Sequence, residues 1–350
     1  MKKIYPLFLL FSLQLFSQND SIKKWNFSGY GEIYYSYDFS EPANHEKADY
    51  IYNHKRHNEL NANLLLVKAN YSEEKLRANL GVMLGNYPHY NLSAEPDWAQ
   101  FIYEANIGFK ISKTKNLWLD VGVLPSHIGF ESAVGADNFT LTRSLIAENS
   151  PYFETGARLS YQNPSENLYL AFLVLNGWQK IQKPDGIQNP SFGAQITFKP
   201  NEKISLNYSN FFGSDTPDAD KNFRTYHNLY AQISPNSKLA IIAGIDLGTE
   251  NQNAETKTWL AAALISKIKL NEKSDIAFRA ERFLDKNQIM ISSNSAKGFK
   301  MFGFSANYDY KISEKILLRF EGKNYNSAHQ LFENQSKNNW FATTSLAIKL

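Results

Sequence analysis

Apolar residues recur at every second position along most of this chain. In segment 76–84 the apolar face consists of Leu76, Ala78, Leu80, Val82 and Leu84, and the other face consists of Arg77, Asn79, Gly81 and Met83. In segment 101–111 the apolar face consists of Phe101, Tyr103, Ala105, Ile107, Phe109 and Ile111. A period of two is typical of a β-strand with one apolar side, whereas a helix would repeat every 3–4 residues.

Sixteen segments show this alternation. They are 24–38, 57–71, 75–86, 99–111, 116–124, 154–162, 166–176, 191–199, 203–211, 225–234, 237–248, 257–269, 273–282, 300–310, 315–323 and 340–350. Seven short polar turns connect some of them, at 72–74, 112–115, 163–165, 200–202, 235–236, 270–272 and 311–314, and these alternate strictly with eight longer connections. Such alternation predicts antiparallel strands with all long loops at one end of the sheet.

An even number of antiparallel strands with short turns at one end and long loops at the other is typical of outer-membrane barrels. We therefore predict the all-β class, with a transmembrane antiparallel β-barrel of about sixteen strands, short periplasmic turns, long outer loops and both termini in the periplasm. A soluble β-sandwich or propeller would also alternate. The length of each apolar face and the lack of a blade repeat of about 40 residues favour the barrel.

The N-terminus has the features of an export signal. Lys2 and Lys3 precede an apolar stretch from Ile4 to Phe16, and the stretch is followed by small and polar residues. We predict a signal peptide over residues 1–17 and a barrel over residues 18–350, because the stretch is shorter than the ~20 residues that a membrane anchor needs. The destination would be the outer membrane of a Gram-negative-type cell.

Composition and charge exclude several classes of function. The chain has no cysteine, so it has no disulfide, thiolate metal ligand or thiol nucleophile. Its formal net charge of +3 over 350 residues does not suggest a nucleic-acid binder. His54 and His57 are three apart but show no helical context, and Ser126 and His127 are too close in sequence to pair as nucleophile and base. We expect no enzyme activity, no catalytic or metal-binding residues and no cofactor.

Three stretches resemble the OmpL-like putative β-barrel porin family. They are WNFSGYGEIYYSYDFS at 25–40, EPDWAQFIYEANIGFKI at 95–111 and WLDVGVLPSHIGFESA at 118–133. The resemblance covers essentially the whole chain after the signal peptide and consists of strand patterns. It implies an outer-membrane porin and defines no ligand-binding residues.

If the apolar face of each strand meets lipid, the opposite face lines the lumen. The acidic side chains on that face are Glu32, Glu59, Glu104, Asp120, Glu154, Asp246, Glu281 and Glu321. The basic ones are Arg77, Lys110, Arg158, Arg279, Arg319 and Lys323. We predict a wet, polar wall with weak charge selectivity, because neither sign forms a ring. Many of these charges would pair across strands and stiffen the wall.

The longest connection, 125–153, mixes apolar and charged residues. Its charges are Glu131, Asp137, Arg143 and Glu148. Because connections of this length are usually functional or disordered, we treat it as a candidate constriction loop that folds into the lumen. A surface hairpin or a contact between subunits is the alternative.

Together these features predict an outer-membrane porin for passive diffusion of small hydrophilic solutes or ions. The expected partners are outer-membrane lipids, the solutes, a homo-trimer as candidate assembly, and the barrel-assembly machinery through the C-terminal strand, although Leu350 replaces the aromatic residue that commonly ends such strands. No nucleic acid is expected. The alternative is a barrel with a blocked lumen that serves as an adhesion or structural protein through its outer loops.

Overall fold

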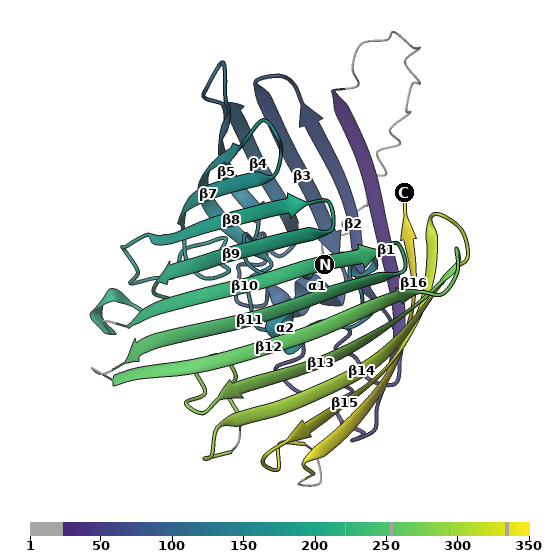
Figure 1. Cartoon of the computed structure of the whole chain (residues 1–350). Helices are drawn as coiled ribbons and strands as arrows, with labels where there is room; N and C mark the ends of the chain where they lie inside the picture. The colour runs from purple at the N-terminus through teal and green to yellow at the C-terminus, as the bar shows by residue number, and fades with distance from the viewer. Residues whose placement is uncertain (1–23, 221, 253–254, 294, 333–335) are drawn as a thin grey trace, which may run out of the picture.

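The computed structural model describes residues 24–220, 222–252, 255–293, 295–332 and 336–350. Its strands form one closed antiparallel barrel in which sequence neighbours pair and β1 also pairs with β16 (Figure 1). The strands are β1 (Trp25–Asp38), β2 (Leu60–Ser72), β3 (Leu76–Leu84), β4 (Ile102–Lys110), β5 (Asn116–Pro125), β6 (Phe153–Gln162), β7 (Leu168–Leu175), β8 (Ser191–Asn201), β9 (Ile204–Gly213), β10 (Phe223–Asn236), β11 (Leu239–Gln252), β12 (Glu255–Lys269), β13 (Ser274–Asp285), β14 (Phe299–Lys311), β15 (Ile316–Ser327) and β16 (Asn338–Lys349). The predicted fold is confirmed. The predicted signal peptide, 1–17, lies outside the described residues.

The turns at one end of the barrel are short and most connections at the other end are longer, as the sequence predicted. The exception joins β11 to β12, which was predicted to be long, because β11 reaches Gln252 and β12 begins at Glu255. Residues expected in a loop instead pair across the two strands, as Glu250 does with Lys257. The strand ends were not predicted because the side chains there are polar on both faces and show no apolar alternation.

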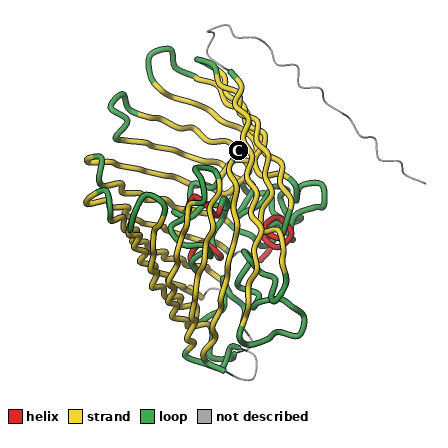
Figure 2. The backbone as a smooth tube through the Cα atoms, turned by 90° about the vertical axis from the view of Figure 1, so that its right-hand side faces the viewer, coloured by secondary structure: helices red, strands yellow, loops and turns green. Residues whose placement is uncertain are grey.

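Short helices occur only within the connections of the described chain. They are α1 (Asn86–Asn91), η1 (Gly135–Asp137), α2 (Leu145–Glu148) and η2 (Asp218–Asp220). Figure 2 shows helical turns and loops within the outline of the strands. In the part of the chain that the structure covers, no helix has the length and apolar character needed to cross a membrane.

The two faces of the strands are distributed largely as the alternation predicted. Phe27, Val67 and Ile107 point outward with exposed fractions of 70%, 66% and 62%. At the seam, Gly29 and Leu350 exchange two backbone hydrogen bonds of 3.1 and 2.8 Å. The outward apolar side chains would be costly in water but are suited to lipid.

One predicted outward residue, Tyr103, points inward. Gly81 pairs with Glu104, but the next residue, Val82, pairs with Ile102, so the register shifts at Tyr103. A β-bulge of this kind places an extra residue in one strand and turns its side chain. Tyr103 therefore packs with the inner apolar residues, and the ammonium of Lys68 lies 5.5 Å from its ring.

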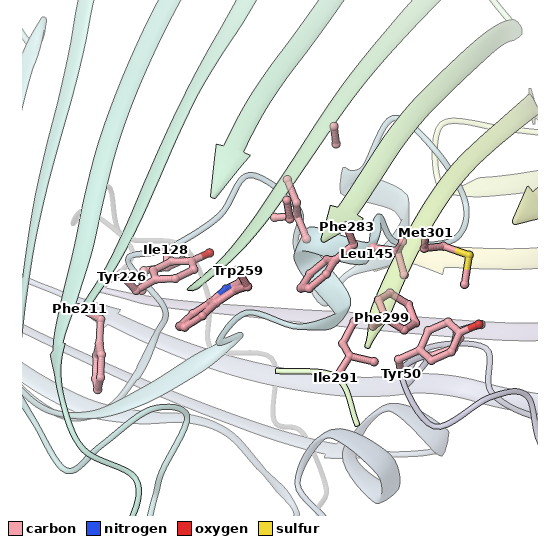
Figure 3. Close-up of a cluster of buried hydrophobic side chains, with 14 of the residues drawn as sticks. Tyr50, Ile128, Leu145, Phe211, Tyr226, Trp259, Phe283, Ile291, Phe299 and Met301 are labelled. Carbon is pink, nitrogen blue, oxygen red and sulfur yellow. The ribbon is translucent and has the colours of Figure 1, made fainter. Parts of the chain in front are cut away.

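The lumen also contains an apolar cluster that the prediction of a wet wall did not include. Figure 3 shows inward-facing aromatic residues from the strands packed against residues of the connections. Its larger members include Tyr50, Ile51, Ile128, Leu145, Ile146, Phe211, Tyr226, Trp259, Phe283, Ile291, Phe299, Met301, Tyr325, Phe332 and Phe341. Most of the strand residues lie near the ends that carry the longer connections, so these connections fold inward and bury apolar surface there.

Candidate functional site in the barrel lumen

The connection 126–152 enters the barrel directly after β5. Its His127 is buried, with Nδ1 2.7 Å from Glu154 Oε2 and Nε2 2.7 Å from the carbonyl oxygen of Asn210. Burial alone would lower the pKa of this imidazole, but the Glu154 carboxylate and the Asn210 carbonyl raise it above its ordinary value. The protonated ring can donate to both acceptors and so ties the start of the connection to β6 and β9.

Phe130 packs the connection against the inner side of β10 and β11. Its ring lies 5.6 Å from that of Tyr230. A Cβ atom at Gly244 would lie only 2.4 Å from Cε1 of Phe130, so the ring occupies the space that a side chain on β11 would fill. The missing side chain of Gly244 thus permits close contact between the connection and the wall.

Arg319 of β15 binds residues 135–138 of the connection to the barrel wall. Its guanidinium donates to the carbonyl oxygens of Gly135 and Asn138 at 2.8 and 3.1 Å. The same group binds Asp309 of β14 at 2.7 and 3.0 Å. A buried guanidinium needs such partners, because an unpaired buried charge is strongly unfavourable.

Arg279 of β13 holds the next part. It donates to the hydroxyl of Thr140 and the carbonyl of Thr142, both at 2.7 Å, and to Glu321 at 2.9 Å. Glu321 in turn accepts the Thr142 N–H at 2.5 Å. Further contacts run from Lys323 to the carbonyl of Arg143 at 2.9 Å and from the Leu145 N–H to Glu281 at 2.5 Å. The backbone from 135 to 145 is therefore fixed along β13–β15.

Four predicted pore-lining residues thus lie beneath this connection. Arg279 and Arg319 are 0% exposed, and Glu281 and Glu321 are 2% and 3% exposed. Alternation showed correctly that they face inward, but it carried no information about the segment that covers them. They anchor the connection and do not face open lumen.

The predicted constriction-loop charges also have partners. Arg143 is buried and donates to the carbonyls of Leu141 and Ala133 at 3.0 and 2.9 Å. The other three contact different parts of the chain: Glu131 accepts from Ser144 N at 3.0 Å, Glu148 accepts from Tyr52 N and Asn53 N at 2.9 and 3.1 Å, and Asp137 pairs with Lys349. Burial raises the pKa of Glu148. Of the four, Asp137 is the one with a largely exposed side chain.

A second set of predicted residues meets on the wall from β3 to β6. Asp120 accepts from Arg77 at 2.5 and 2.6 Å and from Arg158 at 3.2 Å. Between them on β4 lies Gly108, where a Cβ atom would be 2.1 Å from Asp120 Oδ1. The absence of a side chain at Gly108 therefore lets Arg77 reach across a strand. Lys110 lies on the same inward face of β4.

The remaining predicted lumen residues are paired separately. Glu104 binds Lys68 at 2.7 Å, Glu32 accepts from Asn63 at 2.9 Å, and Asp246 accepts from Asn228 at 2.6 Å. Glu59 was predicted to lie in a strand, but the structure places it just before β2, which begins at Leu60. It binds Arg56 at 2.8 Å, and this hydrogen bond is the main cause of its lowered pKa.

The two histidines considered as metal ligands have separate partners. His54 is buried with Nε2 3.3 Å from Glu32, while His57 accepts the Asp38 N–H through Nδ1 at 2.8 Å. The described ranges contain no group of three or more His, Asp or Glu that could hold a metal ion.

Comparison with known proteins gives one family and many similar folds. A family model described as Putative beta-barrel porin-2, OmpL-like, matches residues 24–350. No curated protein matches the sequence. Among solved structures, the anion-selective porin from Comamonas acidovorans has a TM-score of 0.61 at 8% identity, over 93% of this chain and 99% of that porin.

Two further structures show the same architecture. The outer membrane channel DcaP of Acinetobacter baumannii has a TM-score of 0.60 at 11% identity, over 93% of this chain and 97% of the channel. OmpT of Vibrio cholerae, an outer membrane protein, has in its trimer form a TM-score of 0.58 at 8% identity, over 93% and 99% of the two chains. At these identities the likeness shows the fold. Because the family model spans the described chain, the protein belongs to the OmpL-like putative beta-barrel porin-2 family and is an outer-membrane porin.

Proposed function

We propose that this porin is a passive pore for small hydrophilic solutes and that the connection 126–152, within the predicted constriction loop 125–153, narrows its lumen. The observation that carries the proposal is the anchoring of residues 135–145 along β13–β15 by Arg279, Arg319 and Glu321. A barrel of about sixteen strands is wide enough for an aqueous channel. A segment fixed across its interior leaves solutes the space beside it.

The constriction is tested by replacing residues 132–143 with a short Gly-Ser linker and measuring single-channel conductance in planar bilayers. We expect a larger conductance than for the intact protein, because the segment that fills part of the lumen is gone. A similar exchange in the turn 312–315, at the opposite end of the barrel, is the control. Heat-modifiable migration in gels checks that each variant folds. Equal conductance in a folded loop variant would refute the constriction.

The proposal includes no chemistry, no cofactor and no catalytic residue. It also places the short turns and both termini in the periplasm and the longer connections outside the cell. Lipid covers outward residues such as Phe27 and Val67, and the assembly machinery recognises β16. Cleavage after Ser17 removes the signal peptide. N-terminal sequencing of the mature protein tests the cleavage site, and protease cleavage of intact cells tests the orientation.

A homo-trimer is part of the proposal. Its support is that a structure with the same fold, OmpT of Vibrio cholerae, is described in a trimer form. Light scattering of the refolded protein in detergent, corrected for bound detergent, measures the number of chains in the particle. A mass of one chain would contradict the trimer.

The apolar cluster in the lumen favours a second candidate function. Tyr50, Phe299 and Tyr325 fill space near the ends that carry the longer connections, and the rings of Tyr50 and Phe299 meet edge to face with their centres 4.9 Å apart. A lumen closed by this cluster would leave the outer connections as the functional surface, as in an adhesion or structural protein. A folded barrel without conductance would support this alternative.

A further inference from the structure

Toward its short turns, the wall from β3 to β6 carries more positive than negative charge. There Arg77, Lys110 and Arg158 share the inward face with one carboxylate, Asp120, which lies between the two arginines. The other inward carboxylates of these strands, Glu104 and Glu154, lie near the ends that carry the longer connections and are paired with Lys68 and His127. Lys110 forms no ion pair with any residue that the structure describes. Three cations and one anion leave an excess of two positive charges on the part of this wall toward the short turns.

The positive groups are also the ones that face the lumen. The side chains of Arg77 and Arg158 are 31% and 21% exposed, whereas that of Asp120 is 1% exposed. Both arginines use Nε and Nη2 to bind Asp120, and Nη1 of each has no hydrogen bond to the described part of the chain. Two guanidinium edges therefore remain available to a solute.

The opposite wall cannot offer the same contact. Arg279 and Arg319 are fully buried, and their N–H groups are directed to the connection 126–152 and to neighbouring carboxylates. A count of charges along the strands treats all these arginines alike and suggests a balanced wall. Their exposure separates them into anchors on β13–β15 and free donors on β3–β6.

Trp118 further shapes the exposed group. The guanidinium carbon of Arg77 lies 4.4 Å from the centre of the Trp118 ring. This distance allows a cation–π contact, which limits the rotation of the guanidinium. A planar guanidinium held in one orientation suits the planar or tetrahedral oxygens of a carboxylate or phosphate.

We propose that Arg77, Arg158 and Lys110 form a binding subsite for the oxyanion group, carboxylate or phosphate, of a solute in the lumen. The subsite lies toward the end of the barrel with short turns, since Lys110 is the last residue of β4. It deepens the proposed function, because solutes reach it only through the passage that function assumes. It also gives the pore a local preference for anions.

Binding of inorganic phosphate to the refolded barrel in octyl glucoside tests the subsite without requiring conductance. The detergent contains no phosphorus, so broadening of the phosphate line in phosphorus NMR reports binding alone. Arg158→Gln keeps the bond between Arg77 and Asp120, and Lys110→Gln removes a side chain without an ion pair in the described structure. We expect affinity to fall about tenfold for Arg158→Gln, the size of one charge-assisted hydrogen bond, and to fall measurably for Lys110→Gln.

Lys113→Gln is the matched control. Lys113 is exposed in the turn that joins β4 to β5, so the change removes the same charge near the subsite but outside it. Unchanged affinity in this variant is expected. No phosphate binding to the intact protein, or equal affinity in the intact protein and both subsite variants, would overturn the proposal. If Arg158→Gln does not fold, Lys110→Gln decides alone.

Reversal potentials under a potassium chloride gradient separate this proposal from the proposed function. We expect a shift toward cation preference for Lys110→Gln and Arg158→Gln relative to the intact protein. Phosphate binding in detergent with no conductance in bilayers would contradict the passive pore and support the subsite. Conductance with no phosphate binding would support the pore and overturn the subsite.

Discussion

Replacing Arg319 with methionine should release part of the connection 126–152 from the wall. Arg319 is 0% exposed and donates to the carbonyls of Gly135 and Asn138 while binding Asp309. Methionine keeps much of the side-chain volume but removes every donor. Breaking a buried ion pair by removing one partner costs about 3–5 kcal/mol.

Part of that cost falls on the connection itself. Two hydrogen bonds from a charged donor are lost, and each contributes about 1.5–3 kcal/mol. Lys267, which lies 3.4 Å from Asp309, continues to compensate that carboxylate and limits the effect on the wall. A loss of even ~2 kcal/mol raises the opened fraction of the connection roughly thirtyfold.

Amide hydrogen exchange, read by mass spectrometry on peptides that cover 130–145, measures this opening. Exchange in the refolded Arg319→Met protein should be faster by a factor of this size, while peptides from β13–β15 change less. Arg282→Met is the control, because Arg282 is exposed and faces outward beside Phe302. Equal exchange in the intact protein and Arg319→Met would refute the idea that this guanidinium fixes the connection.

Three further outcomes are expected. Because the pKa of His127 is raised, the stabilisation from its contacts with β6 and β9 is complete below the ordinary pKa of 6.5 and is lost as pH rises through the raised value. Amide hydrogen exchange at 126–130, relative to the intrinsic rate, should therefore increase with pH. This pH dependence should be absent in His127→Gln. Burial lowers the pKa of Lys47 from 10.5 to about 7, so between these pH values the unfolded connection 39–59 binds more protons than the folded one. The folded connection should therefore become more stable, and more resistant to proteolysis, as pH rises from 7 to 10.5. Lys47→Met should show no such trend. Gly108→Ala would place Cβ 2.1 Å from Asp120 Oδ1 and should lower the free energy of unfolding by about 1–3 kcal/mol, measured by denaturant unfolding. Gly322→Ala, whose Cβ meets nothing within 4 Å, should be nearly neutral in the same assay.

Local alternation predicted the strands because lipid outside the barrel imposes the same requirement on each of them. Boundaries differ where this requirement is weak. At the ends of β11 and β12 the outward residues are polar, such as Thr249 and Thr256, so the pattern ends before the hydrogen bonding does. At Tyr103 a bulge reverses the face, and only Gly81 on the neighbouring strand hints at the space required.

The lumen was less predictable because its contacts are long-range. Alternation assigned Arg77 and Arg319 equally to the inward face. Whether such an arginine meets solvent or holds a loop depends on a segment far away in the sequence, here Gly135 and Asn138 for Arg319. The mixed composition of 125–153 gave the only local signal, since apolar residues such as Ile128 and Leu145 need a buried partner surface.

Planar-bilayer recording of the intact, refolded protein tests the central claim most directly. The account predicts discrete single-channel steps from a barrel whose lumen is narrowed by the connection 126–152. A folded, heat-modifiable barrel that gives no steps over repeated insertions would contradict it and would assign the function to the outer connections.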